Sequence, residues 1–385
     1  MRIVLLTAWF FDYTIQLANS LSKIRNSEVY LYMPSNTHKI LGDSWKNSVD
    51  KDIHLTVYGT EKTGLLGYLA LPKTILYLIG NILKLNPDII HVQESGSIAI
   101  TAILPFISKY PIVTTNHDVK PHLGLDKGIW GIYREIMRKI ATRYSKMIFV
   151  HGTYLKDLAI DYLHLLPEKV QVIPIGEQDV LPFKKFINED MNAPSNEKTI
   201  LFFGRIHEYK GLKYLIEAEP IISREIPNIK IVIAGIGEDF RKYEDMMINK
   251  QNFIVHNYHI PYDEGAQLIQ KAKLIVLPYV DASQSGVIPI AYGFKKPVVV
   301  TNVGSIPEIV DNGITGYIVP PRDPVALGNA IIKMLKNEEL LQEMGENAYD
   351  KLKRDLSWER ISKITVEAYH RACNELSPIT RHENW

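Results

Sequence analysis

The sequence predicts an α/β protein made of two doubly wound halves, each a parallel sheet covered by helices. Short apolar runs alternate along the chain with stretches of helical periodicity, which is typical of parallel sheets. The alternation occurs twice, on either side of a polar, proline-containing stretch at residues 188–198. With 385 residues, 46% of them hydrophobic, the chain is longer than one core usually supports. We therefore expect two domains with a ligand site between them, outside the carboxyl ends of the strands.

The predicted strands of the N-terminal half begin at the start of the sequence. Residues 1–11 are apolar but short, and Asp12 follows directly, so we interpret this segment as a buried strand rather than a signal peptide. The runs that predict strands here are Ile3–Leu6, Val29–Leu31, Ile89–Val92, Ile112–Thr115, Met147–Val150 and Val170–Ile173.

The C-terminal half repeats the pattern after regular patterning lapses between Pro174 and Thr199. Its predicted strands are Ile200–Phe203, Ile229–Ala234, Phe253–Val255, Leu274–Leu277, Val298–Thr301 and Tyr317–Val319. The amphipathic stretch Trp358–Leu376 predicts a helix that returns to the first half. We assign residues 1–178 to an N-terminal domain that binds the acceptor, 179–357 to a C-terminal nucleotide-binding domain, and 358–385 to the returning helix and tail.

Composition excludes several classes of function. The balance of 44 basic against 43 acidic residues argues against a general polyanion binder, so we expect no nucleic-acid partner. The single cysteine, Cys373, excludes an intramolecular disulfide and a cysteine-built zinc site. No stretch is long enough for a clear membrane span, and we expect a cytoplasmic protein.

The most informative local feature is the segment Gly204–Gly211, which joins a predicted buried strand to a predicted amphipathic helix. Glycines let backbone approach a ligand, and the free amides at a helix start favour an anion. Arg205 and Lys210 add full positive charges that can neutralise a diphosphate. The alternative, that both are solvated loop cations, stays open for this segment taken alone.

Four other segments lie where predicted strands end: Thr115–Asp118, Ala234–Asp239, Ser283–Val287 and Val303–Glu308. In this order, and together with Gly204–Gly211, they resemble the family 4 glycosyltransferases, which are retaining sugar-nucleotide enzymes with two Rossmann-like domains in the GT-B arrangement. The resemblance spans nearly the whole chain and is densest between residues 200 and 320.

The resemblance implies a hexose-type sugar moved from a UDP- or GDP-type donor to a hydroxyl of a glycan or lipid-linked acceptor. It implies that the anomeric configuration is kept and that no metal or other cofactor takes part. Cations such as Arg205 and Lys210 would stabilise the charge that grows on the leaving diphosphate. His117 matches the family's histidine at the end of an N-domain strand, where its ring would face the donor sugar and position it. A structural role is the alternative for a lone histidine.

The donor site is expected to combine glycine turns with amides and side-chain oxygens. Gly235 and Gly237 suit a tight turn close to a ligand, and the segment before the predicted helix at Val287 could hold the diphosphate or sugar hydroxyls. The residues that we predict to bind the donor are Gly204, Gly211, Gly235, Gly237, Gln284, Ser285, Gly286, Val287 and Glu308.

One departure from the family pattern bears on activity. The family usually carries two glutamates, with seven residues between them, just before the Pro297–Val298 strand. Ala282 and Ile290 stand at those positions. Either this chain belongs to a branch that binds the donor through residues 283–287, or it is a relative that binds without turnover. We favour the branch, because the paired cations, His117 and Glu308 are all present.

Two segments of the N-terminal half bear on the acceptor. Gly64–Leu85 is mostly apolar and contains Lys73 and Pro72, and Lys120–Lys146 mixes basic, apolar and aromatic residues. Such a surface could rest on anionic lipid. In the alternative interpretation Ile132, Ile136 and Ile140 pack on the sheet, and Gly64–Leu85 is a helix that faces the core.

Three other functions compete. A sugar-nucleotide epimerase shares the fold but needs acid and base carboxylates that the sequence does not display. A dehydrogenase is disfavoured because Thr7–Phe11, after the first strand, lacks the glycine fingerprint of dinucleotide binding. A noncatalytic sugar-nucleotide sensor is the main rival from another class.

Overall fold

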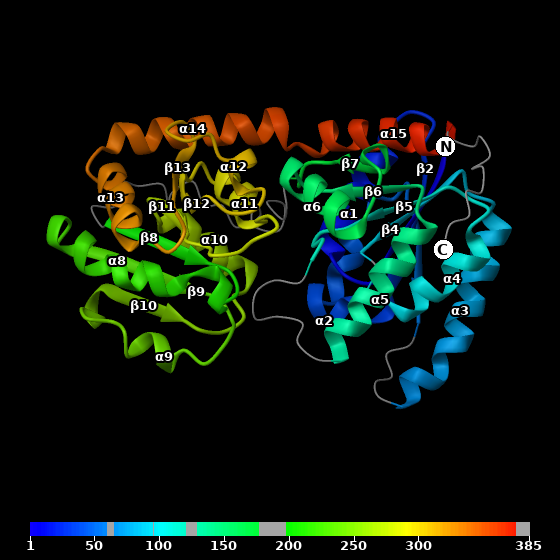
Figure 1. Ribbon diagram of the computed structural model, residues 1–385, viewed down its shortest axis with the longest axis horizontal. Helices are drawn as coiled ribbons and strands as arrows, with labels where there is room; N and C mark the ends of the chain where they lie inside the picture. The colour runs from blue at the N-terminus through cyan, green and yellow to red at the C-terminus, as the bar shows by residue number, and fades with distance from the viewer. Residues whose placement is uncertain (60–64, 95, 121–128, 177–197, 375–385) are drawn as a thin grey trace.

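The structure, a computed structural model, describes residues 1–59, 65–94, 96–120, 129–176 and 198–374 (Figure 1). It contains two parallel sheets, and their strand orders are β3-β2-β1-β4-β5-β6-β7 and β10-β9-β8-β11-β12-β13. The strands of the first are β1 (Arg2–Thr7), β2 (Glu28–Pro34), β3 (His54–Tyr58), β4 (Ile89–Gln93), β5 (Ile112–Thr115), β6 (Met147–Val150) and β7 (Val170–Val172). Those of the second are β8 (Lys198–Phe203), β9 (Ile229–Ala234), β10 (Phe253–His256), β11 (Leu274–Leu277), β12 (Val298–Thr301) and β13 (Gly316–Val319). The predicted pair of doubly wound halves is confirmed.

Helices cover both faces of each sheet (Figure 1). Those of the first half are α1 (Phe11–Ser22), α2 (His38–Leu41), α3 (Leu65–Leu85), α4 (Ile98–Ile107), α5 (Ile129–Tyr144) and α6 (Thr153–Leu163). Those that follow are α8 (Leu212–Glu225), α9 (Arg241–Glu244), α10 (Tyr262–Lys271), α11 (Val287–Gly293), α12 (Ile306–Ile309), α13 (Pro324–Leu335), α14 (Glu338–Asp355) and α15 (Trp358–Asn374). Short 3-10 turns are η1 (Ser35–Thr37), η2 (Asp43–Ser48), η3 (Pro167–Lys169), η5 (Glu208–Lys210) and η6 (Lys250–Asn252).

Alternate residues of each strand enter different cores, as the period of two in a strand requires. In the first sheet, Ile3 and Leu5 of β1 join a core that includes α1 and α15. Val4 and Leu6 of the same strand join a separate core with α3 and α4. All four of these β1 side chains are fully buried. The near-continuous apolar runs of the sequence are therefore explained by strands buried on both faces.

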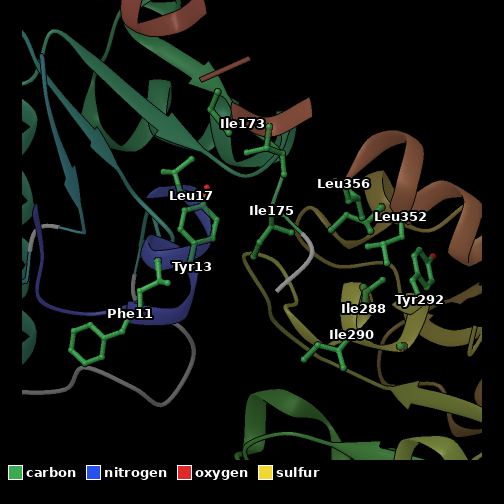
Figure 2. Close-up of a cluster of buried hydrophobic side chains, with 14 of the residues drawn as sticks. Phe11, Tyr13, Leu17, Ile173, Ile175, Ile288, Ile290, Tyr292, Leu352 and Leu356 are labelled. Atoms are coloured by element: carbon green, nitrogen blue, oxygen red, sulfur yellow. The ribbon is translucent and has the colours of Figure 1, made fainter. Parts of the chain in front are cut away.

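The core that includes α1 continues across the boundary between the two halves. Ile173 and Ile175, in the segment that leaves the first sheet, belong to the same cluster as α1 and as residues of α11 and α14. Figure 2 shows Ile175 between Tyr13 of α1 and Leu356, which follows α14. The two domains are thus joined by a continuous apolar contact.

The last helix crosses back to the first domain, as predicted. Figure 1 shows α14 and α15 lying end to end along one side of both halves. α15 packs on α1, where the Ser20 hydroxyl donates to the Trp358 carbonyl at 2.8 Å and lies 2.9 Å from the Ser362 hydroxyl. Residues 375 and 376 of the predicted helix, and the proposed boundary at 178/179, lie outside the described residues.

Candidate active site

The cationic segment Gly204–Gly211 leaves the carboxyl end of β8, where it was expected, and is anchored by its backbone. Tyr209 accepts from the amides of Val280 and Asp281 at 2.8 and 3.3 Å. Gly211 has φ +68°, and a Cβ there would lie 1.9 Å from the carbonyl oxygen of Pro278. Only glycine can take this left-handed conformation against another backbone without strain. The segment is therefore fixed on the chain that follows β11.

Lys210 lies in a setting that destabilises its own positive charge. Its ammonium nitrogen is 3.7 Å from the centroid of the Tyr279 ring and 5.1 Å from that of Tyr209. Burial lowers the pKa of Lys210 to about 8, while the opposed charge of Asp118 raises it and the neighbouring Arg205 lowers it further. A desolvated ammonium that is held on an aromatic face is prepared to receive an anion. Arg205 itself is exposed.

Asp118 belongs to the other domain, in the segment after β5. Its negative charge raises the pKa of Lys210, so the two side chains are near enough for their charges to interact across the domain interface. The roles of Thr115–Asp118, Arg205 and Lys210 in one site stay a prediction.

The glycines after β9 have a packing role. A Cβ on Gly235 would lie 1.9 Å from the carbonyl oxygen of Gly204, and one on Gly237 would lie 1.9 Å from that of Ile206. Ile206 and Gly237 also form a parallel bridge. These two glycines therefore let the turn after β9 lie directly against the cationic segment. Their predicted contact with the donor remains a prediction.

The segment Ser283–Val287 meets the lysine through Tyr279. The Tyr279 hydroxyl lies 3.3 Å from the Ser285 hydroxyl, and both residues are buried. Gly286 immediately precedes α11, which begins at Val287. Gln284 has a buried side-chain oxygen with no hydrogen-bond partner. The sequence could not show that an aromatic ring would join Lys210 to this segment.

Glu308 makes a contact that the sequence did not predict. Its carboxylate accepts from the backbone amides of Thr153 at 2.7 Å and Tyr154 at 2.8 Å, in the first turn of α6. Gly152 precedes that helix and has no side chain to cap it. Glu308 therefore acts as an N-terminal cap supplied by the other domain. In this conformation the carboxylate joins the domains, whereas we had predicted that it binds the donor.

Gly152 lies against the same loop of the second domain. Its φ is +149°, and a Cβ there would lie 2.3 Å from the Ser305 hydroxyl. Ser305 is fully buried, and its hydroxyl has no hydrogen-bond partner. A cavity of about 220 Å³ lies beside this contact, lined by residues of both domains that include His151, Glu308 and Arg360.

His117 differs from the expectation that its ring faces the donor. The ring is fully buried, and Phe10 stacks on its face with centroids 3.7 Å apart. Its Nδ1 lies 2.9 Å from Nε2 of His151, and its Nε2 lies 3.3 Å from Oε1 of Gln93. Burial lowers the pKa of His117 well below its ordinary value, and the nearby His151 and His91 lower it further. The ring is thus neutral and covered in this conformation.

Phe10 is a strained cover. It has φ 56° and ψ 46° at the N-terminal end of α1, a left-handed conformation that is unusual for a bulky side chain. Its carbonyl accepts from the Thr14 amide at 3.0 Å and from the Thr14 hydroxyl at 2.8 Å. The neighbouring Trp9 is 52% exposed. Two aromatic residues therefore lie at the carboxyl end of β1, beside the candidate site.

The positions of the two absent glutamates are now explained locally. Ile290 is 8% exposed and packs in the core shared by both domains, as Figure 2 shows. Ala282 is buried, and its carbonyl oxygen would lie 1.8 Å from a Cβ on Gly304. Asn116, beside His117, is also buried, and both polar atoms of its side chain lack partners. Buried polar atoms without partners are costly and indicate a ligand or water, so Asn116 joins the candidates that the sequence did not single out.

No group of three or more histidine, cysteine, aspartate or glutamate side chains in the described ranges is arranged to hold a metal ion. Among the helices of the described chain, none combines the length and apolar character that crossing a bilayer requires.

Two Rossmann-like domains that meet through the carboxyl ends of their strands, with a cationic loop on one side, define the GT-B class. The fold is similar to that of sucrose-phosphate synthase from Thermosynechococcus elongatus, with a TM-score of 0.72 at 17% identity, covering 96% of this chain and 98% of that one. It is also similar to HepE of Anabaena in complex with UDP and glucose, with a TM-score of 0.69 at 16% identity, covering 96% and 99%. At these identities the likeness shows the fold alone.

The sequence comparisons give the family. Residues 12–176 match the profile of glycosyltransferase family 4, and residues 183–351 match that of glycosyl transferases group 1. An uncharacterized glycosyltransferase of Methanocaldococcus jannaschii is 29% identical over 73% of this chain and 75% of its own length. The capsular polysaccharide biosynthesis glycosyltransferase CapM of Staphylococcus aureus is 24% identical over 76% and 80%. The chain belongs to the family 4 glycosyltransferases, with the GT-B fold, and the predicted resemblance is confirmed.

Proposed function

We propose that this protein is a retaining glycosyltransferase that moves a hexose-type sugar from a nucleoside diphosphate to a hydroxyl of a glycan or lipid-linked acceptor. The observation that carries the proposal is Lys210, desolvated against Tyr279 and opposed to Asp118 of the other domain. The solved complex of HepE with UDP and glucose supports a nucleotide-sugar donor. CapM, a glycosyltransferase of capsular polysaccharide biosynthesis, supports a glycan acceptor.

The chemistry needs little from acid or base side chains. The bond from the anomeric carbon to the diphosphate oxygen breaks, and the acceptor oxygen forms the new bond on the same face of the sugar. The acceptor proton passes to the departing phosphate oxygen. Arg205 and Lys210 stabilise the charge that develops on that diphosphate, and because they are positioned in advance they favour the transition state over the ground state. No metal or other cofactor is part of the proposal.

A second candidate, a noncatalytic sugar-nucleotide binder, is favoured by one observation. Ile290 is a core residue where the family usually has a carboxylate, so this chain cannot use that position to hold a donor hydroxyl. We favour the enzyme because Lys210 keeps a charge in a setting that costs stability. Gln284, Ser285 and Asn116 offer alternative polar contacts.

The test is a panel of UDP-, GDP- and ADP-sugars. For the enzyme, one donor raises the melting temperature and is slowly hydrolysed without acceptor, because water replaces the acceptor hydroxyl. For the noncatalytic binder, the donor stabilises the protein but is not consumed. We expect Arg205→Ala and Lys210→Ala to lower turnover at least tenfold, which corresponds to about 1.4 kcal/mol or more of transition-state stabilisation.

Lys213→Ala provides the matched control for those variants. Lys213 is the second residue of α8, its side chain is 54% exposed, and it pairs with Glu217 at 3.6 Å. Its loss removes a nearby cation of the same type without touching the proposed site. Equal turnover of the Arg205, Lys210 and Lys213 variants would exclude the first two from catalysis.

On the acceptor side, α3 exposes Leu69 and Leu76, and α5 exposes Ile132 and Ile136; together we call these four side chains the apolar surface. These side chains are 68%, 70%, 63% and 48% exposed. The interpretation in which Ile132 and Ile136 pack on the sheet is therefore wrong. The interpretation of α3 as a helix that faces the core holds for one of its faces, where Leu78 and Ile82 are fully buried. Leu69 and Leu76 of the same helix are exposed.

Basic residues continue this surface. Lys139 and Arg143 follow Ile132 and Ile136 at helical spacing on α5, so an apolar and a cationic patch lie along one stripe. That combination suits a bilayer rich in anionic lipid, where the apolar side chains enter the interface and the cations meet headgroups. We propose that the protein works in the cytoplasm, with this surface resting on the inner face of the membrane.

Vesicle flotation tests the membrane proposal. We expect binding to vesicles with anionic lipid at low salt, weaker binding at high salt, and loss of binding in Ile132→Ser with Ile136→Ser. Ile248→Ser is the control, because Ile248 is 75% exposed on the other domain. Failure to float with anionic vesicles at low salt refutes this proposal and leaves the donor chemistry untouched.

A further inference from the structure

His117 lies in the middle of a chain of buried polar side chains. Along β4, β5 and β6, the residues on the face toward α1 and α15 include His91, Gln93, Thr115, His117 and His151. All are at most 2% exposed. Their nitrogen and oxygen atoms contact one another rather than water, so each proton in the chain constrains the next.

The direction of this chain is set at one end by a backbone carbonyl. Nδ1 of His151 lies 2.9 Å from the carbonyl oxygen of Ile173, which can only accept a hydrogen bond. His151 therefore carries its proton on Nδ1. Burial lowers the pKa of His151 to about 4, so the ring is neutral near pH 7 and its Nε2 has no proton. That bare nitrogen must accept.

The acceptor nitrogen of His151 determines the tautomer of His117. Nδ1 of His117 is 2.9 Å from Nε2 of His151, so this contact is a hydrogen bond only if His117 donates from Nδ1. A neutral His117 then has a bare Nε2. Among the described residues, the ring nitrogens of His117 contact His151 and Gln93 and no carboxylate, so none of these contacts favours a second proton.

The carboxamide of Gln93 must then turn its nitrogen toward His117. Gln93 lies between the two rings, with one end 3.3 Å from Nε2 of His117 and the other 3.1 Å from Nε2 of His91. Oxygen and nitrogen of a terminal amide are assigned from the network around them. With the amide nitrogen donating to His117, the amide oxygen accepts from Nε2 of His91.

The far end of the chain agrees with this direction. Burial lowers the pKa of His91 to about 3, so a proton on Nε2 leaves its Nδ1 bare. The Tyr369 hydroxyl lies 2.6 Å from that Nδ1 and can donate to it. The Thr115 hydroxyl, 2.7 Å from Nε2 of His91, accepts as a second partner. Each ring nitrogen of His91, His117 and His151 then faces a partner of the opposite kind, with the Nε2 proton of His91 shared between Gln93 and Thr115.

We infer that His151 and Gln93 are positioning residues that hold His117 as the neutral Nδ1–H tautomer, with its Nε2 lone pair available only to a donor. Resting on the proposed function, this means that a sugar hydroxyl can meet His117 only by donating to Nε2 in place of the Gln93 amide, after Phe10 has moved off the ring. It excludes His117 as a cation or a general acid at neutral pH.

The two ends of this hydrogen-bonded series of side chains lie on the two connections between the domains. Ile173 is in the segment that leaves the first sheet, and Tyr369 is on α15, which returns from the second domain. A shift of either connection would disturb the hydrogen bonds that orient the ring. The tautomer is therefore fixed by the same contacts that fix the relative position of the domains.

Nitrogen NMR of the full chain tests the inference without any donor. Protein labelled with ¹⁵N-histidine gives distinct signals for protonated and bare ring nitrogens, and the His117 signals are assigned by their absence in His117→Gln. We expect protonated Nδ1 and bare Nε2 for His117, unchanged between pH 6 and 8. A proton on Nε2 of His117, alone or with one on Nδ1, overturns the inference.

The variant His151→Phe tests the positioning role. Without the acceptor at His151, a buried Nδ1–H on His117 would lack a partner, so we expect the proton to move to Nε2 and the Gln93 amide to turn over. Tyr58→Phe is the control, because it removes another buried hydroxyl of this domain, bonded to the Thr7 carbonyl at 2.7 Å. A His117 that stays protonated on Nδ1 in His151→Phe overturns the role of His151.

The tautomer of His117 and the proposed function can be tested separately. If His151→Phe does not fold, the spectrum of the unaltered protein decides the tautomer alone. Absence of turnover with every nucleotide sugar would refute the proposed function while the tautomer of His117 could still be as inferred. With an active donor, we expect His151→Phe to raise KM and to lower kcat at least threefold, whereas Tyr58→Phe leaves both unchanged.

Discussion

Proton uptake on donor binding is the sharpest consequence of the setting of Lys210. Burial lowers the pKa of its amine to about 8, from an ordinary value of 10.5. That drop corresponds to roughly 3 kcal/mol of penalty on the charged form. This cost to the folded protein is fully present below pH 8, where the amine is charged, and it is relieved as the pH rises above 8 and the amine loses its proton. A bound diphosphate would offset it, because the opposite charge restores the pKa toward its ordinary value.

The magnitude follows from linkage. At pH 8.5, an amine with a pKa of about 8 is about one quarter charged, and one with a pKa near 10.5 is almost fully charged. Binding of UDP should therefore take up about three quarters of a proton at pH 8.5, but only about a tenth at pH 7. Between pH 8 and 10 the apparent affinity should fall by up to about tenfold for each pH unit.

Isothermal titration of UDP in buffers with different ionisation enthalpies measures this uptake directly. Lys210→Arg is the matched variant, because a guanidinium stays charged throughout and proton changes on the nucleotide cancel in the difference. We expect the uptake at pH 8.5 to disappear in Lys210→Arg and to persist in Lys213→Ala. Equal uptake by the unaltered protein and Lys210→Arg would show that Lys210 does not meet the diphosphate.

Two other outcomes follow from the domain interface, and a third from an exposed glycine of α3. Glu308→Ala should cost about 1 kcal/mol of stability and speed amide exchange at Thr153, as loss of a helix cap does. The control is Glu346→Ala, on the surface. If exchange at Thr153 were no faster in Glu308→Ala than in this control, the capping role would be contradicted. Gly152→Ala should destabilise by more than about 2 kcal/mol, with partial rescue by Ser305→Gly, because the clash is with that side chain. Gly80→Ala is the control, because no atom lies within 4 Å of the added Cβ. It should stabilise the protein by up to about 1 kcal/mol in a thermal melt. A destabilisation equal to that of Gly152→Ala would refute the steric argument.

The fold could be predicted from the sequence almost entirely, because parallel strands buried on both faces leave a strong signal. The strand that we did not predict is β3 (His54–Tyr58), which lies at the edge of the first sheet. Its sequence mixes His54 and Thr56 with apolar residues, since an edge strand is only partly buried. Pro72 lies inside α3, in a segment for which a helix was one interpretation.

The candidate site was predicted in its parts but not in its contacts. Arg205 and Lys210 carry a local signal, because glycines and cations at the start of a helix are close in sequence. The contact of Lys210 with Tyr279 and the cap that Glu308 gives to α6 join residues far apart in the chain. Only tertiary structure brings them together. Burial of His117 under Phe10 depends on a backbone conformation that the sequence does not encode locally.

The domain interface shows why strain and unmatched charge gather here rather than in the cores. One side of it is held by Glu308 on α6 and by the shared apolar core. The other side has Lys210, on which the charge of Asp118 acts from the first domain. A diphosphate that reaches Lys210 brings like charge near that carboxylate. We therefore expect donor binding to give Lys210 a stronger partner than Asp118, while the contacts of Glu308 hold the domains together on their side.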